Sequence, residues 1–159
     1  MMRKSVVSAA LLVLALAHPA AHATEAGATI SGELQRFFRE YLSVTKAEAP
    51  RFNLPAIWVY NPSGNLVARI DAEADIQRFG DLLKDADAAS LSSLKLDQLS
   101  QITAKIGAPF PATEEGQWTA LLLSSDDCHA VCSGIRARLK EAQRANPGLV
   151  RIVDFTLRR

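Results

Sequence analysis

Cys128 and Cys132 are the residues of this chain whose type and spacing could do redox chemistry. Three residues separate them, and His129 stands beside the first. Residues four positions apart lie on one face of a helix, so the two sulfurs can meet within a single turn. In an exported protein an isolated cysteine pair most often forms a disulfide. The sequence therefore predicts a disulfide between them, either a structural cross-link or a reactive couple.

The cysteine pair is expected at the point where a buried strand ends and a helix begins. Residues 118–123 form a continuous apolar run of the kind found in strands buried on both faces, and the serines and aspartates at 124–127 are typical of a helix start. Backbone N–H groups and the helix dipole at such a start favour the thiolate, as would a protonated His129. Asp126 and Asp127 disfavour it, so the net effect on the thiol pKa is left open.

The short loop between the cysteines bears on the choice between a structural and a reactive disulfide. On the loop-entropy model it stabilises less than the roughly 3 kcal/mol given by a fifteen-residue loop. This small effect favours a reactive dithiol or a metal site, although an inert disulfide stays open. His129 could tune the thiolate or could be an ordinary solvated residue at the helix start.

The first 23 residues are predicted to be a cleavable signal peptide. Arg3 and Lys4 precede an apolar run at 6–17, and Ala21-His22-Ala23 has the small-x-small pattern that a signal peptidase needs. The run is shorter than the roughly 20 residues that span a bilayer. We therefore expect a periplasmic or secreted protein with one domain over residues 24–159 and no membrane span after cleavage.

The charge balance excludes some classes of partner. Loss of Arg3 and Lys4 leaves 16 of the 18 Lys and Arg against 17 Asp and Glu, a net charge near −1. No basic stripe interleaved with aromatic residues was found, so nucleic acid and anionic lipid are not expected as partners. Cleavage also leaves His129 as the single histidine, which excludes a histidine-rich metal cluster.

Periodicity and turn residues predict an α/β domain. A helix capped by Ser31 is expected over 31–47, then a hairpin of strands at 54–60 and 66–70, and further helical segments around 76–83 and 96–106. The connection at 85–93 and the loop at 109–116 carry little information. Residues 118–157 form a strand-helix-strand unit that should cross over right-handed, with strands at 118–123 and 149–157 and a helix from Cys128 to Asn146.

The stretch from Trp118 to Cys132, with its long helix and following strand, resembles the redox half of the thioredoxin-like superfamily. Residues 54–70 and the helical segment after them resemble the closing hairpin and last helix of that fold. The halves stand in reverse order, which implies a circular permutation. In that arrangement the 31–47 helix would bridge the halves and residues 86–117 would join the old ends. The implied fold is a three-layer sandwich with a central mixed sheet of about four strands.

The resemblance also implies roles for residues outside the cysteine pair. Pro55 matches the cis-proline whose loop faces the cysteines, and with Leu54 it would line the substrate site. The chain departs from thioredoxins in its three-residue spacing, in Asp127 before the first cysteine, and in Leu122 where they carry a buried acid. The spacing is similar to that of Sco-type copper chaperones, but Ser133 replaces their proline and their distant histidine ligand is missing.

The cysteine pair and the resemblance together predict an exported thioredoxin-like protein that acts in thiol-disulfide exchange, and whether it is an enzyme, a thiol-disulfide oxidoreductase, is left open. Cys128 would attack the disulfide of an exported protein substrate or redox partner, and Cys132 would resolve the mixed disulfide. This hypothesis requires no cofactor. One alternative is a copper chaperone that holds Cu(I) with both cysteines, and His129 as a third ligand. Another is a non-catalytic binding module with a structural disulfide.

Overall fold

The fold is seen in a computed structural model that describes residues 27–46, 53–71, 73–85, 87–91 and 94–159. The predicted signal peptide lies outside these residues. Five strands form one mixed, open sheet in the order β1-β5-β4-β2-β3. Their bounds are β1 Gly27–Glu33, β2 Ala56–Tyr60, β3 Leu66–Ile70, β4 Trp118–Ser125 and β5 Val150–Arg158. The chain is therefore an α/β protein, as predicted.

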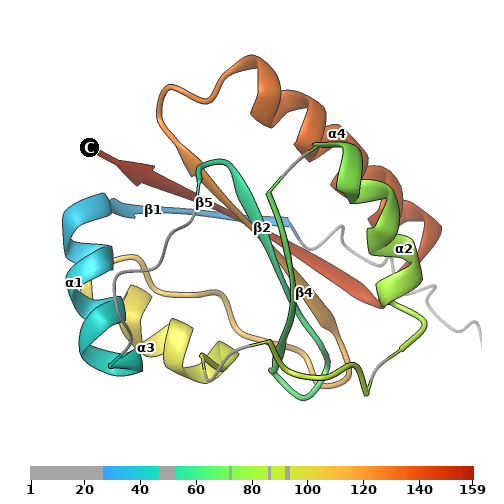
Figure 1. The fold of residues 1–159 in the computed structure, drawn as a ribbon, viewed down its shortest axis with the longest axis horizontal. Helices are drawn as coiled ribbons and strands as arrows, with labels where there is room; N and C mark the ends of the chain where they lie inside the picture. The colour runs from blue at the N-terminus through green and yellow to red at the C-terminus, as the bar shows by residue number, and fades with distance from the viewer. Residues whose placement is uncertain (1–26, 47–52, 72, 86, 92–93) are drawn as a thin grey trace, which may run out of the picture.

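Helices cover both faces of this sheet, so the molecule has three layers (Figure 1). One face carries α1 and α3, and the other carries α4 and a 3₁₀ helix, η1, that continues into α2. The bounds are α1 Leu34–Thr45, η1 Glu73–Arg78, α2 Phe79–Leu82, α3 Leu96–Lys105 and α4 Ala130–Ala145. No helix in the described part of the chain is long and apolar enough to cross a membrane.

Strands β4 and β5 form the centre of the sheet and are paired in parallel, with Leu122 beside Asp154. Parallel neighbours need a crossover connection, and α4 supplies it. On the far side of β4 the hairpin of β2 and β3 runs antiparallel, with Ala56 beside Leu123. The predicted hairpin and the predicted strand-helix-strand unit are both confirmed.

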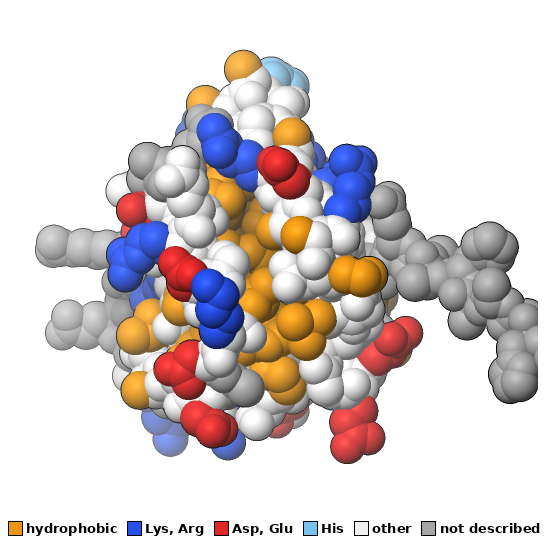
Figure 2. Space-filling model, turned by 90° about the vertical axis from the view of Figure 1, so that its right-hand side faces the viewer, with side chains coloured by type: hydrophobic (Ala, Val, Ile, Leu, Met, Phe, Trp, Pro, Cys, Tyr) orange, Lys and Arg blue, Asp and Glu red, His pale blue; other side chains and the backbone are white. Residues whose placement is uncertain are grey.

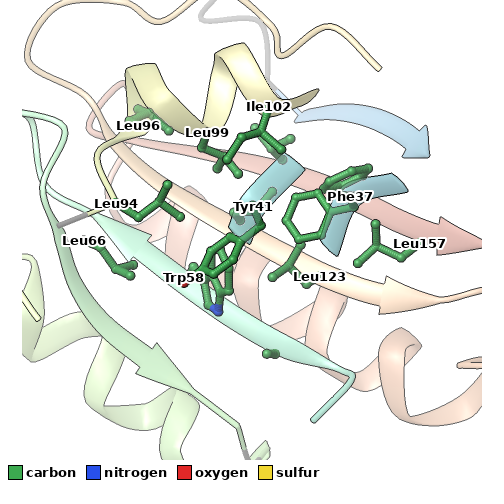
Figure 3. Close-up of a cluster of buried hydrophobic side chains, with 14 of the residues drawn as sticks. Phe37, Tyr41, Trp58, Leu66, Leu94, Leu96, Leu99, Ile102, Leu123 and Leu157 are labelled. Atoms are coloured by element: carbon green, nitrogen blue, oxygen red, sulfur yellow. The ribbon is translucent and has the colours of Figure 1, made fainter. Parts of the chain in front are cut away.

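Each face of the sheet has its own hydrophobic core. Aromatic and leucine side chains from α1 and α3 pack against Trp58 of β2 and Leu123 of β4 (Figure 3). Phe37 is fully buried at the centre of this cluster, with its ring 5.4 Å from that of Phe155. On the other face Ile135 and Leu139 of α4 belong to the second cluster. Seen from the side, the surface has a band of hydrophobic side chains between charged ones (Figure 2).

The N-terminal segment corrects the predicted helix cap. Ser31 lies in β1, which pairs with β5, and α1 begins at Leu34 with Glu33 as its N-cap residue. The sheet consequently has five strands where about four were expected. The segment Gly-Ala-Thr-Ile-Ser-Gly-Glu has one large apolar residue, Ile30, so its hydrophobic pattern is too weak to indicate a strand.

Gly32 explains part of that weak pattern. A Cβ at this position would lie 2.7 Å from Cδ1 of Ile106 and 3.3 Å from the ring of Phe155. The glycine therefore lets the end of α3 approach the sheet at β1.

Two other predicted helices differ in detail. The expected helix around 76–83 is a 3₁₀ helix followed by a single α-helical turn. Helix α4 begins at Ala130, so Cys128 lies in the turn before the helix and not inside its first turn. Val131, in the first turn of this helix, is 53% exposed.

The aromatic core predicts a large effect of Phe37→Ala on stability. Removing this ring leaves a cavity between α1 and β5, and we expect the free energy of unfolding to fall by about 3–5 kcal/mol. Denaturant unfolding followed by circular dichroism measures the change. Arg36→Ala, at an exposed position of the same helix, should change stability by less than about 0.5 kcal/mol. Equal effects of the two substitutions would contradict this account of how α1 packs.

Candidate redox site

Cys128 and Cys132 are joined by a disulfide, as the sequence predicted, with an S–S distance of 2.15 Å and a Cα–Cα distance of 5.6 Å. The two residues differ in their exposure. Cys132 is fully buried in the first turn of α4, whereas Cys128 is half-buried in the turn between β4 and that helix. An attacking molecule therefore reaches the sulfur of Cys128 more easily than that of Cys132.

The turn that carries Cys128 is held by backbone hydrogen bonds. The Cys128 N–H donates to the carbonyl of Ser125 at 3.1 Å, and the His129 N–H donates to the carbonyl of Asp127 at 3.0 Å. The carbonyl of His129 then accepts from both the N–H and the hydroxyl of Ser133, at 3.2 and 2.9 Å. These bonds fix Cys128 directly before the amino end of α4.

His129 occupies the N-cap position of α4 but makes no side-chain capping hydrogen bond. Its side chain is exposed. Among the described residues no group of three or more His, Cys, Asp or Glu is arranged to hold a metal ion. His129, the possible third Cu(I) ligand of the copper-chaperone alternative, is thus not part of such a group with the two cysteines.

The acidic side chain next to Cys128 belongs to a small polar cluster. The hydroxyl of Ser125 donates to the carboxylate of Asp127, and Nη2 of Arg159 lies 3.8 Å from the same carboxylate. The hydrogen bond from Ser125 is the main reason that the pKa of Asp127 lies below its usual range, with a backbone hydrogen bond and Arg159 acting in the same direction. Asp127 therefore carries its negative charge throughout the neutral pH range.

Leu54 and Pro55 lie at the same end of the sheet as the cysteines. Strand β2 begins one residue later, with Ala56 beside Leu123, and it runs antiparallel to β4. The amino end of β2 consequently adjoins the carboxyl end of β4, from which the cysteine turn emerges. The peptide bond between Leu54 and Pro55 is cis.

An open groove of about 410 Å³ lies at this end of the molecule. Its lining residues are Leu34, Phe38, Asn53, Leu54, Ser125, Asp127 and Arg159. The groove thus joins the predicted docking residue Leu54 to the turn residues that immediately precede Cys128. Pro55 and the two cysteines are not among its lining residues. The contributions of α1 and Arg159 were not predicted, because no local sequence pattern indicates which distant segments meet here.

A polar cluster beneath α4 was also missed. Asp154 of β5 accepts a hydrogen bond from Arg136 of α4 and is 3.5 Å from the hydroxyl of the fully buried Ser124. That hydroxyl is 3.3 Å from the hydroxyl of Thr156. A charged residue inside the apolar run at 149–157 was the available signal. Leu122 is the cross-strand neighbour of Asp154.

Comparisons with known proteins add no relative to this description. No protein-family model matches the chain, and neither the curated proteins nor the solved structures include a match.

The partly buried ion pair predicts an energetic coupling between α4 and β5. In a double-mutant cycle of Arg136→Gln and Asp154→Asn we expect a coupling energy of about 1 kcal/mol, because the Asp154 side chain is only 16% exposed and the two groups share a charge-assisted hydrogen bond. Denaturant unfolding of the single and double variants measures this coupling. The matched control is the pair of Lys84 and Asp81, whose side chains are 76% and 78% exposed. That pair should show no measurable coupling, and a larger coupling there would contradict the argument.

Proposed function

We propose that this protein performs thiol-disulfide exchange through Cys128 and Cys132. The observation that carries the proposal is the unequal exposure of the two sulfurs, since Cys132 is fully buried and Cys128 is half-buried before the helix. An exchange protein needs one accessible sulfur that attacks and a second, sheltered one that resolves the intermediate. A cross-link with a purely structural role has no need of this asymmetry.

The proposed reaction transfers two electrons from the reduced protein to a substrate disulfide. The thiolate of Cys128 attacks one substrate sulfur, forms a mixed disulfide and releases the other substrate sulfur as a thiolate. Cys132, as a thiolate, then attacks the sulfur of Cys128 and releases the second substrate thiolate. The protein ends with the disulfide between its two cysteines, and the two protons lost by its thiols balance those gained by the substrate.

The arrangement of elements supports a permuted thioredoxin-like domain as the scaffold for this reaction. The cysteine turn follows β4 in the chain, and β4 is paired in parallel with β5. On the other side of β4 the hairpin of β2 and β3 is added, with β2 antiparallel to β4. The segment predicted to join the old ends, residues 86–117, contains α3, which lies on the same face of the sheet as α1. The cis bond before Pro55 lies at the cysteine end, where the resemblance places such a bond.

The remaining roles follow from position. Leu54 and Pro55 would contact the substrate near the groove, and His129 would favour the thiolate of Cys128 when it is protonated. With a signal peptide over residues 1–23, the protein would work in the periplasm or outside the cell, where disulfides persist. Its partner would be an exported protein that supplies or receives the disulfide.

Single cysteine substitutions test the order of attack. After reduction and exposure to oxidised glutathione, Cys132→Ser should accumulate a mixed disulfide at Cys128, because no resolving thiol is left. Cys128→Ser should stay unmodified far longer, because Cys132 is fully buried. Intact-protein mass spectrometry over time measures both reactions. Equal rates of modification at the two cysteines would remove the basis of the proposal.

The reduction potential separates an exchange-competent pair from a structural one. Equilibration in glutathione buffers, followed by trapping of free thiols, should give a value above about −250 mV. A value below about −300 mV marks a structural disulfide and overturns the proposed function.

A further inference from the structure

Asp127 is the charged residue adjacent to Cys128 for which the structure gives fixed contacts. The hydroxyl of Ser125 donates to its carboxylate, and Arg159 lies 3.8 Å from it. Asp126, one residue earlier, is exposed. The carboxylate of Asp127 therefore has two polar partners, belongs to the residue directly before Cys128, and lines the groove that contains Leu54.

We infer that Asp127 is a positioning residue that destabilises the thiolate of Cys128 and so makes the couple more reducing, and that Arg159 limits this effect. The inference rests on the proposed exchange function. A fixed negative charge beside a thiolate disfavours the ionised sulfur, and a less stable dithiolate form favours the disulfide. Asp127 thus opposes the stabilisation of the thiolate that the amino end of α4 provides.

The other groups around Cys128 do not cancel this charge. The turn itself contributes Asp126 and His129, and Arg159 reaches Asp127 from the residue that follows β5. Within the part of the chain that the structure describes, α1 and the segment before β2 bring uncharged residues to the groove, which are Leu34, Phe38, Asn53 and Leu54. Among the described residues that line the groove, Arg159 is consequently the one positively charged group, and it lies 3.8 Å from the carboxylate of Asp127.

Asp127 remains ionised over the whole range in which a thiol titrates. The hydrogen bond from Ser125, a backbone hydrogen bond and Arg159 all lower its pKa. A carboxyl group with a lowered pKa keeps its charge above its usual pKa and loses it only as the pH falls further, whereas a free thiol titrates near pH 8.5. The charge on Asp127 is therefore constant while Cys128 ionises.

The size of the effect follows from Coulomb's law in a solvated turn. Unit charges on the order of 6 Å apart in water interact strongly enough to change an ionisation constant about threefold, which is about half a pH unit. The interaction is screened by salt because the Debye length shrinks to about 3 Å at 1 M.

The experiment measures two quantities in Asp127→Asn and Arg159→Gln. The first is the pH midpoint for alkylation of Cys128 by iodoacetamide, an uncharged reagent, in the Cys132→Ser background. The second is the equilibrium of the intact couple with glutathione. We expect Asp127→Asn to lower the midpoint by about half a unit. At a pH above that midpoint, where Cys128 of the reduced protein is ionised, it should also shift the equilibrium about threefold toward the reduced form, which is about 14 mV for a two-electron couple.

Arg159→Gln should shift both quantities in the opposite direction, and 1 M NaCl should reduce all the shifts. A structural disturbance has no reason to reverse its sign between the two variants. Unchanged values in Asp127→Asn, or shifts of the same sign in both variants, overturn the inference. The proposed function still stands in that case if the unsubstituted protein exchanges its disulfide with glutathione. A disulfide of the unsubstituted protein that resists exchange overturns the proposed function, and this inference with it.

Discussion

The parallel pairing of β4 and β5 is the constraint on which the rest of the molecule depends. Both strands are almost entirely buried, so their backbone groups must be paired within the sheet and their side chains must be covered on both faces. Parallel pairing requires a crossover, and α4 provides it. Since both strands run in the same direction, the chain leaves β4 at the end of the sheet where the carboxyl ends of β4 and β5 lie, and α4 begins there. The cysteine turn lies at that junction.

The antiparallel strand β2 completes the site for a related reason. It pairs with β4 on the side away from β5, so its amino end adjoins the carboxyl end of β4. Leu54 is thereby brought beside Ser125 although about seventy residues separate them in the chain. Helix α1, packed on one face through Phe37, supplies Leu34 and Phe38 to the same groove. The groove is thus a product of strand direction and of the core beneath it.

The sequence was most informative where apolar pattern and turn chemistry agreed. The runs at 118–123 and 149–157 and the turn at 61–65 have strong signals, so the central strands and the hairpin were predicted. Strand β1 was missed because small residues fill it, and the close approach of the Ile106 side chain to Gly32 is a tertiary contact that no local pattern reveals. The disulfide could be predicted from spacing. The contacts of Asp127 with Arg159 and of Asp154 with Arg136 depend on how distant segments meet, so they could not be.

The position of β5 has a consequence for the order in which the chain can fold. It follows the four other described strands in the chain, yet it lies between β1 and β4 and pairs with both, for example joining Gly27 to Ile152. Until it emerges, β1 has no partner and one edge of β4 stays open. Contacts between residues so far apart in sequence slow folding, and the intermediate exposes strand edges. The five-stranded sheet therefore cannot close until residues 150–158 are available to pair with both β1 and β4.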